Sequence, residues 1–120
     1  MVDAAEREMS YVLKQEMREE AAATLVRAMY ECFRQLGDAL LLARGFEAKD
    51  HHVMIDEVLH MNVDTPQPLI VLDRLRRTRM KINYEGYFPS KAELDDFNQF
   101  SRTCWHIVLT EARKTIAKTQ

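Results

Sequence analysis

Apolar residues recur at intervals of three and four along most of this chain, which is the spacing of amphipathic helices. One long run covers 19–44, and its apolar positions are Leu25, Met29, Cys32, Phe33, Leu36, Leu40 and Ala43. It ends at Gly45, a residue typical of the position just after a helix. A second long run covers 91–118. It follows Ser90 and Glu93, which have the spacing of a capping box.

Three shorter helices complete the predicted pattern. The first covers 3–18 with Asp3 as its N-cap, and the pattern leaves open whether a turn near 20–23 separates it from the next. Another covers 51–60, with Asp50 as cap and Val53, Met54, Val58 and Leu59 facing inward. The fourth starts at the Asp64-Thr65-Pro66-Gln67 motif and runs to about Asn83, before an aromatic turn at 84–89.

No stretch predicts a strand, and only 3 Gly and 3 Pro occur in 120 residues. A chain so poor in turn residues favours long helices joined by short loops. We therefore predict an all-α fold, an antiparallel up-and-down bundle of four to five helices, formed by a single domain over residues 1–120.

The fourth predicted helix changes from apolar to basic along its length. At ~100° per residue, Leu72, Leu75, Arg79 and Ile82 share one stripe, with Arg76 and Asn83 beside it. Arg74, Arg77 and Lys81 lie on the opposite side, where water can solvate them. A charge among leucines is costly unless it is paired or lines a site. Arg79 is therefore expected either to pair with an acid such as Glu16 or Glu31, or to bind a ligand.

Composition excludes several classes of protein. The net charge of −2 gives no bulk attraction to nucleic acid or membranes, although positions 74–81 carry five positive charges. The 2 cysteines are too few for a disulfide framework and favour a reducing compartment. No signal peptide and no apolar run of about 20 residues is visible. We expect a cytoplasmic protein that does not insert into membranes.

Candidate chemistry is sparse. His52, Asp56 and His60 are spaced four apart on one predicted helix, but the first and third differ by about 80° around it and converge poorly on a metal. No nucleophile motif, phosphate loop or dinucleotide fingerprint is present. We expect no metal and no other cofactor. The basic helix remains, with Tyr84, Tyr87 and Phe88 just beyond it as aromatic surfaces on which bases stack.

The order of these features resembles the HEPN family (higher eukaryotes and prokaryotes nucleotide-binding domain). The resemblance covers residues 20 to 118 and is carried by Gly45, His51-His52, Arg76, Arg79, Asn83, Tyr84 and Pro89. It implies a small stand-alone prokaryotic module, usually a homodimer, of toxin–antitoxin or defence systems. Many members are metal-independent ribonucleases, often encoded beside a minimal nucleotidyltransferase partner.

The ribonuclease signature of that family is an Arg followed, after four to six residues, by a His. Arg79 matches the Arg, but Tyr84 stands where catalytic members carry His, and Met80 replaces the polar residue that commonly follows the Arg. A phenol with a pKa near 10 is a poor base at neutral pH. The departure favours a module without the full catalytic motif.

The leading prediction is thus a module that binds a nucleotide, RNA or a nucleotidyltransferase. Its predicted binding residues are Arg76, Arg79, Asn83, Tyr84 and Tyr87. One alternative is an endoribonuclease toxin in which Arg79 binds the phosphate and Tyr84, or a histidine from elsewhere such as His51 or His52, is the catalytic acid or base. The other is a purely structural bundle in which Arg79 forms a salt bridge at a dimer seam.

Overall fold

The structure, a computed structural model, describes residues 1–47 and 51–119, and only the backbone of His51 and His52. It contains five α-helices and one short 3-10 helix, and no strand occurs in the described residues. In chain order the elements are α1 (Val2–Leu13), η1 (Glu19–Ala21), α2 (Ala22–Ala43), α3 (His51–Leu59), α4 (Val71–Glu85) and α5 (Lys91–Lys118). The prediction of an all-α bundle of four to five helices is confirmed.

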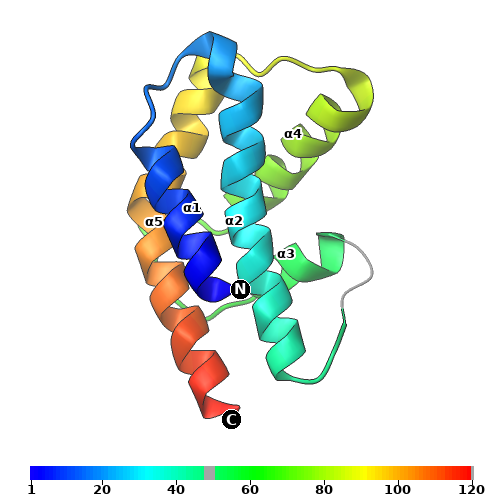
Figure 1. The fold of residues 1–120 in the computed structure, drawn as a ribbon, viewed down its shortest axis with the longest axis vertical. Helices are drawn as coiled ribbons and strands as arrows, with labels where there is room; N and C mark the ends of the chain where they lie inside the picture. The colour runs from blue at the N-terminus through cyan, green and yellow to red at the C-terminus, as the bar shows by residue number, and fades with distance from the viewer. Residues whose placement is uncertain (48–50, 120) are drawn as a thin grey trace.

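Helix α2 is the centre of the fold, and each of the other four α-helices packs against it. Figure 1 shows α1 and α5 side by side on one side of α2, with α3 and α4 on the other. Buried apolar side chains from all five helices form one continuous core, in which Phe33, Leu36, Phe97 and Phe100 have no exposed surface. Burial of each such side chain stabilises the fold by roughly 1.5–3 kcal/mol. Among the described helices, none is long and apolar enough to span a membrane.

Local signals at two helix ends are confirmed. The Ser90 hydroxyl accepts from the Glu93 N–H at 3.1 Å, and the Glu93 carboxylate accepts from the Ser90 N–H at 3.1 Å. This is the predicted capping box at the start of α5. Gly45 has a φ of 83°, and the Phe46 N–H closes the end of α2 by donating to the Leu41 carbonyl at 2.9 Å.

The predicted bounds of the first helix are wrong. α1 ends at Leu13, five residues early, and Asp3 lies in its first turn while Met1 occupies the cap position. Arg102 of α5 donates to the Leu13 carbonyl and so satisfies one of the acceptors that a helix end leaves open. A turn and η1 then separate α1 from α2, which answers the question that the sequence left open.

The predicted start of the fourth helix is also wrong, because α4 begins at Val71. The Thr65 hydroxyl donates to the Gln67 carbonyl at 2.6 Å and closes a turn, so it does not cap a helix. The physical reason is Pro68, because a proline disfavours the helical conformation in the residue before it. Residues 61–68 therefore form a connection between α3 and α4.

The inward face of α3 differs from the prediction at two positions. Met54 and Val58 are buried as expected, but Val53 is 40% exposed and Ile55 is 0% exposed. α3 crosses α2 at Gly37 so closely that a Cβ atom there would lie 1.9 Å from the Met54 carbonyl oxygen. This contact brings the side of α3 that carries Met54 and Ile55 against α2. The predicted cap Asp50 lies outside the described residues.

Candidate functional site: an arginine cluster between α2 and α4

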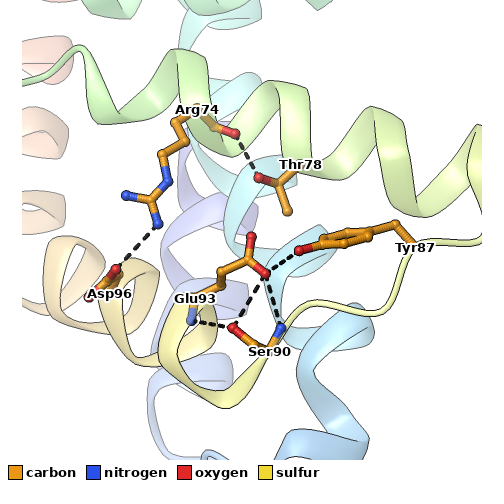
Figure 2. Close-up of polar contacts among 6 residues, drawn as sticks. All are labelled: Arg74, Thr78, Tyr87, Ser90, Glu93 and Asp96. Carbon is orange, nitrogen blue, oxygen red and sulfur yellow. Dashed lines mark hydrogen bonds and ion pairs between the residues drawn. The ribbon is translucent and has the colours of Figure 1, made fainter.

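The faces of α4 follow the predicted pattern with one shift. Leu72, Leu75 and Ile82 are buried, and Arg74, Arg77 and Lys81 are exposed. Thr78 occupies the buried position between Leu75 and Ile82. Its hydroxyl donates to the Arg74 carbonyl at 2.9 Å (Figure 2). Arg79 therefore lies at the edge of the apolar stripe, half-buried, and not at its centre as predicted.

Arg79 is held by an aromatic ring and by an amide. Its central guanidinium carbon lies 5.5 Å from the centroid of the Tyr30 ring. With the Asn83 amide oxygen turned toward Arg79, that oxygen accepts from Arg79 Nε at 3.1 Å and from Nη2 at 3.2 Å. The opposite orientation would place the oxygen 3.5 Å from Arg27 Nη1. We assign the first orientation, because it makes two shorter bonds to one guanidinium.

No carboxylate of the described chain forms an ion pair with Arg79. Of the two acids considered from the sequence, Glu16 forms an ion pair with Arg18 at 2.7 Å, and Glu31 forms one with Arg34. A cation–π contact and a neutral amide orient a guanidinium without neutralising it. Arg79 thus keeps its positive charge in a half-buried place.

Helix α2 contributes the other wall of this site. Tyr30 is 1% exposed, and burial raises its pKa to about 12, against the opposing effect of the Arg79 and Arg34 guanidiniums. Arg34 binds Glu31, and its Nη1 lies 3.0 Å from the Met54 sulfur of α3. The ring of Tyr30 therefore lies against α4 with cations around it, and its hydroxyl is protonated at neutral pH.

We define the arginine cluster as Arg27, Arg34, Arg76 and Arg79, and two acids pair with members of it. The acids are Glu31, on Arg34, and Asp73, whose carboxylate binds Arg76 Nη2 at 2.9 Å. The Arg34 and Arg76 side chains are each 17% exposed. Positive charge exceeds negative charge in the cluster, at a place where solvent screening is reduced.

Tyr84 lies at the open end of the cluster. Arg76 Nη1 lies 3.3 Å from the Met80 sulfur one turn later, and Tyr84 follows Met80 by one further turn. Residues four apart are neighbours on a helix surface, so these three side chains form a strip along α4. Tyr84 is 76% exposed, which leaves its ring available for stacking.

Tyr87 belongs to a different set of contacts, at the junction of α4 and α5. Its hydroxyl donates to the Glu93 carboxylate, which also accepts from the Ser90 N–H and hydroxyl (Figure 2). Lys81 lies over its ring at 5.7 Å. The structure therefore brings Arg76, Arg79 and Asn83 together with Tyr84 on the same helix, while Tyr87 fixes the turn beyond them.

Sequence reasoning missed the residues that α2 adds. Arg27, Tyr30 and Arg34 are spaced by three and four, so they form a stripe of their own beside the apolar one. That spacing was readable, but only the packing of α2 on α4 shows what the stripe faces. The side chain of His52 lies outside the described residues, and the described His, Cys, Asp and Glu side chains form no group that could hold a metal ion.

Comparisons of the chain with protein-family models, with curated proteins and with solved structures found no match. The chemical capacity of the arginine cluster therefore rests on its own groups. A guanidinium presents its N–H donors in a fixed fork. Among common ligand groups, phosphates and carboxylates have the oxygen geometry that matches this fork best.

Proposed function

We propose that this chain is a HEPN-type binding module that holds a nucleotide or single-stranded RNA at the arginine cluster between α2 and α4. The observation that carries the proposal is the state of Arg79. It is half-buried and oriented by Tyr30 and Asn83, and no carboxylate of the described chain neutralises it. A cation kept in this way is complementary to an anion from outside the chain.

The surrounding charges support a phosphate as that anion. Arg76 and Arg34 are paired with Asp73 and Glu31, yet each guanidinium has five N–H donors and uses only some of them on its acid. A phosphate bound to Arg79 would add a second acceptor for these neighbours. Such charge-assisted bonds contribute about 1.5–3 kcal/mol each.

Tyr84 supports a nucleotide over inorganic phosphate. Its exposed ring stands two turns beyond Arg76, on the same strip of α4. Stacking of a base on an aromatic side chain contributes about 1–3 kcal/mol and tolerates any base. Phosphate on the arginines and a base on Tyr84 would make a site for single-stranded RNA with little sequence preference.

The resemblance to the HEPN family extends the proposal. It implies a homodimer, a role in toxin–antitoxin or defence systems and a nucleotidyltransferase as protein partner. The five-helix architecture is compatible with that resemblance. Light scattering of the purified chain tests the dimer, and co-purification from the source cell tests the partner.

The test of the binding function is fluorescence anisotropy with a short labelled single-stranded RNA, in EDTA. Wild type is compared with Arg79→Ala and with the control Arg113→Ala, which removes one positive charge from the α1–α5 side, where Arg113 pairs with Asp3 and Glu6. We expect Arg79→Ala to weaken binding about tenfold or more, and Arg113→Ala to change it little. Equal weakening by both variants, or no RNA binding by wild type, would overturn the proposal.

The same samples test for catalysis. Tyr84 is the only group of the expected Arg–Tyr pair that could exchange a proton, and a phenol does so poorly at neutral pH. We therefore expect the RNA to stay intact in EDTA. Cleavage that disappears in Arg79→Ala would replace the binding module with a ribonuclease.

A further inference from the structure

A second site lies in a cavity of about 210 Å³ between α3 and α5. Both helices pack on α2, which forms the floor with Leu40 and Arg44. Glu57 and Met61 line one wall, and Glu111 and Thr115 of α5 line the other. The volume is below the roughly 300–1,000 Å³ of drug-sized sites, so it suits a small metabolite. This inference is independent of the proposed function, because the cavity and the arginine cluster share no residue.

An ion pair lines this cavity. Arg44 Nη2 lies 2.7 Å from Glu57 Oε1, and the Arg44 guanidinium also lies over the Phe46 ring at 5.6 Å. These contacts fix the guanidinium from two directions. They leave further N–H groups of Arg44, and the second carboxylate oxygen of Glu57, without a partner among the described residues.

An ion pair in a cavity wall selects against simple ions. A lone cation is attracted by Glu57 and repelled by Arg44, and a lone anion meets the reverse. A ligand with both charges a few ångströms apart can satisfy both groups at once. The ammonium and carboxylate of an α-amino acid have that arrangement, with the ammonium on Glu57 and the carboxylate on Arg44.

Glu111 indicates which amino acid. It lines this cavity and also an adjoining one of about 300 Å³, which Asp64 and Lys114 line as well. Glu111 forms no ion pair with another residue of the described chain, and with Asp64 it outweighs the single charge of Lys114. Leu40 and Met61 add apolar surface to the lining of the same cavity, beside the Arg44–Glu57 pair and Glu111. The lining therefore matches methylene groups that lead to a second positive charge.

We propose that the cavity between α3 and α5 binds a free basic α-amino acid such as lysine. Arg44 holds its carboxylate, Glu57 its α-ammonium and Glu111 the cation of its side chain. His60, which follows α3, also lines the cavity, and its Nδ1–H donates to the Asp56 carbonyl at 2.8 Å.

Calorimetric titration of the full chain with three related compounds tests the two charges at the α-carbon. The compounds are L-lysine, cadaverine, which lacks the carboxylate, and 6-aminohexanoate, which lacks the α-amino group. We expect L-lysine to bind, and each analogue to bind about tenfold more weakly or not at all. Failure of L-lysine to bind, or equal binding of either analogue, would overturn the proposal.

Three variants assign the residues. Glu57→Gln and Glu111→Gln each keep the shape and remove one charge, and Asp96→Asn is the control from another exposed ion pair, with Arg74 at 3.3 Å. We expect Glu57→Gln to weaken lysine binding about tenfold. Glu111→Gln should abolish the preference for L-lysine over norleucine, while Asp96→Asn binds as wild type does. Unchanged binding in both glutamine variants would place the ligand elsewhere, and the analogue series on wild type decides the matter if a variant does not fold.

Discussion

The guanidinium of Arg79 lies over the ring of Tyr30, with its central carbon 5.5 Å from the ring centroid. This pair joins the two helices that form the arginine cluster. Tyr30 is almost fully buried in α2, so the ring is a fixed surface, and Arg79 extends along it from α4. A core residue, Tyr30, thereby fixes the position of the Arg79 guanidinium.

The first prediction concerns that ring. Tyr30→Leu removes the cation–π contact, which contributes about 0.5–2 kcal/mol, and leaves Arg79 less well oriented. We expect it to weaken RNA binding about two- to thirtyfold. Tyr30→Phe keeps the ring and should bind nearly as wild type does. The same anisotropy titration measures all three proteins, with a thermal melt of each to show that it is folded. Equal loss in both variants would mean that the hydroxyl, and not the ring, matters.

The second prediction concerns the crossing of α2 and α3. Gly37→Ala would place a Cβ atom 1.9 Å from the backbone oxygen of Met54, so α3 must move. We expect a loss of about 2 kcal/mol in the free energy of unfolding, measured by urea denaturation. Helix propensity alone would instead stabilise this variant by about 1 kcal/mol. A stabilised Gly37→Ala would therefore contradict the observed crossing.

A matched glycine controls this experiment. Gly45 has a φ of 83°, and an added Cβ would meet nothing within 4 Å. Asn tolerates that left-handed conformation, so Gly45→Asn should change the unfolding free energy little.

The third prediction concerns acid stability at the junction of α4 and α5. Partial burial alone would raise the pKa of Glu93, but the bonds from Tyr87 and Ser90 outweigh it and lower that pKa below its ordinary value of 4.5 (Figure 2). A carboxyl whose pKa is lower in the folded state stabilises the fold above its unfolded pKa. That contribution is lost as the pH falls through the folded value.

Glu93→Gln should therefore flatten the pH dependence of the urea midpoint below about pH 4.5. It should also lower stability at neutral pH, by about 1 kcal/mol, because it weakens the capping box. Glu20→Gln is the control, since Glu20 is exposed and lies 3.8 Å from Arg18. If Glu20→Gln and Glu93→Gln changed the pH dependence of the urea midpoint equally, the hydrogen bonds of Glu93 would not be the cause of the change.

Local chemistry made part of this fold predictable. Ser90 and Glu93 predict the start of α5, because both partners of the capping box lie within four residues of each other in the sequence. Gly45 predicts the end of α2, and the apolar stripes of α2 and α5 predict the buried core. Each of these signals depends on neighbours in sequence, so the sequence is enough to read it.

Other features depend on contacts between distant residues and were mispredicted or missed. The end of α1 depends on Arg102, which is 89 positions away and donates to Leu13. The inward face of α3 depends on its close crossing at Gly37, and the stripe of Arg27, Tyr30 and Arg34 has meaning only against α4. The start of α4 was different: Pro68 was a local signal that outweighed an apparent cap at Thr65.

The proposed RNA-binding site is tested most directly by finding which arginine side chains respond when RNA binds. NMR spectra of the arginine Nε–H groups, recorded while a short single-stranded RNA is titrated in, report each guanidinium separately. We predict that the signals of Arg79 and Arg76 shift and saturate together, while that of Arg113 stays in place. RNA-dependent shifts at Arg113 that equal those at Arg79, or saturating binding that leaves Arg79 unmoved, would contradict it.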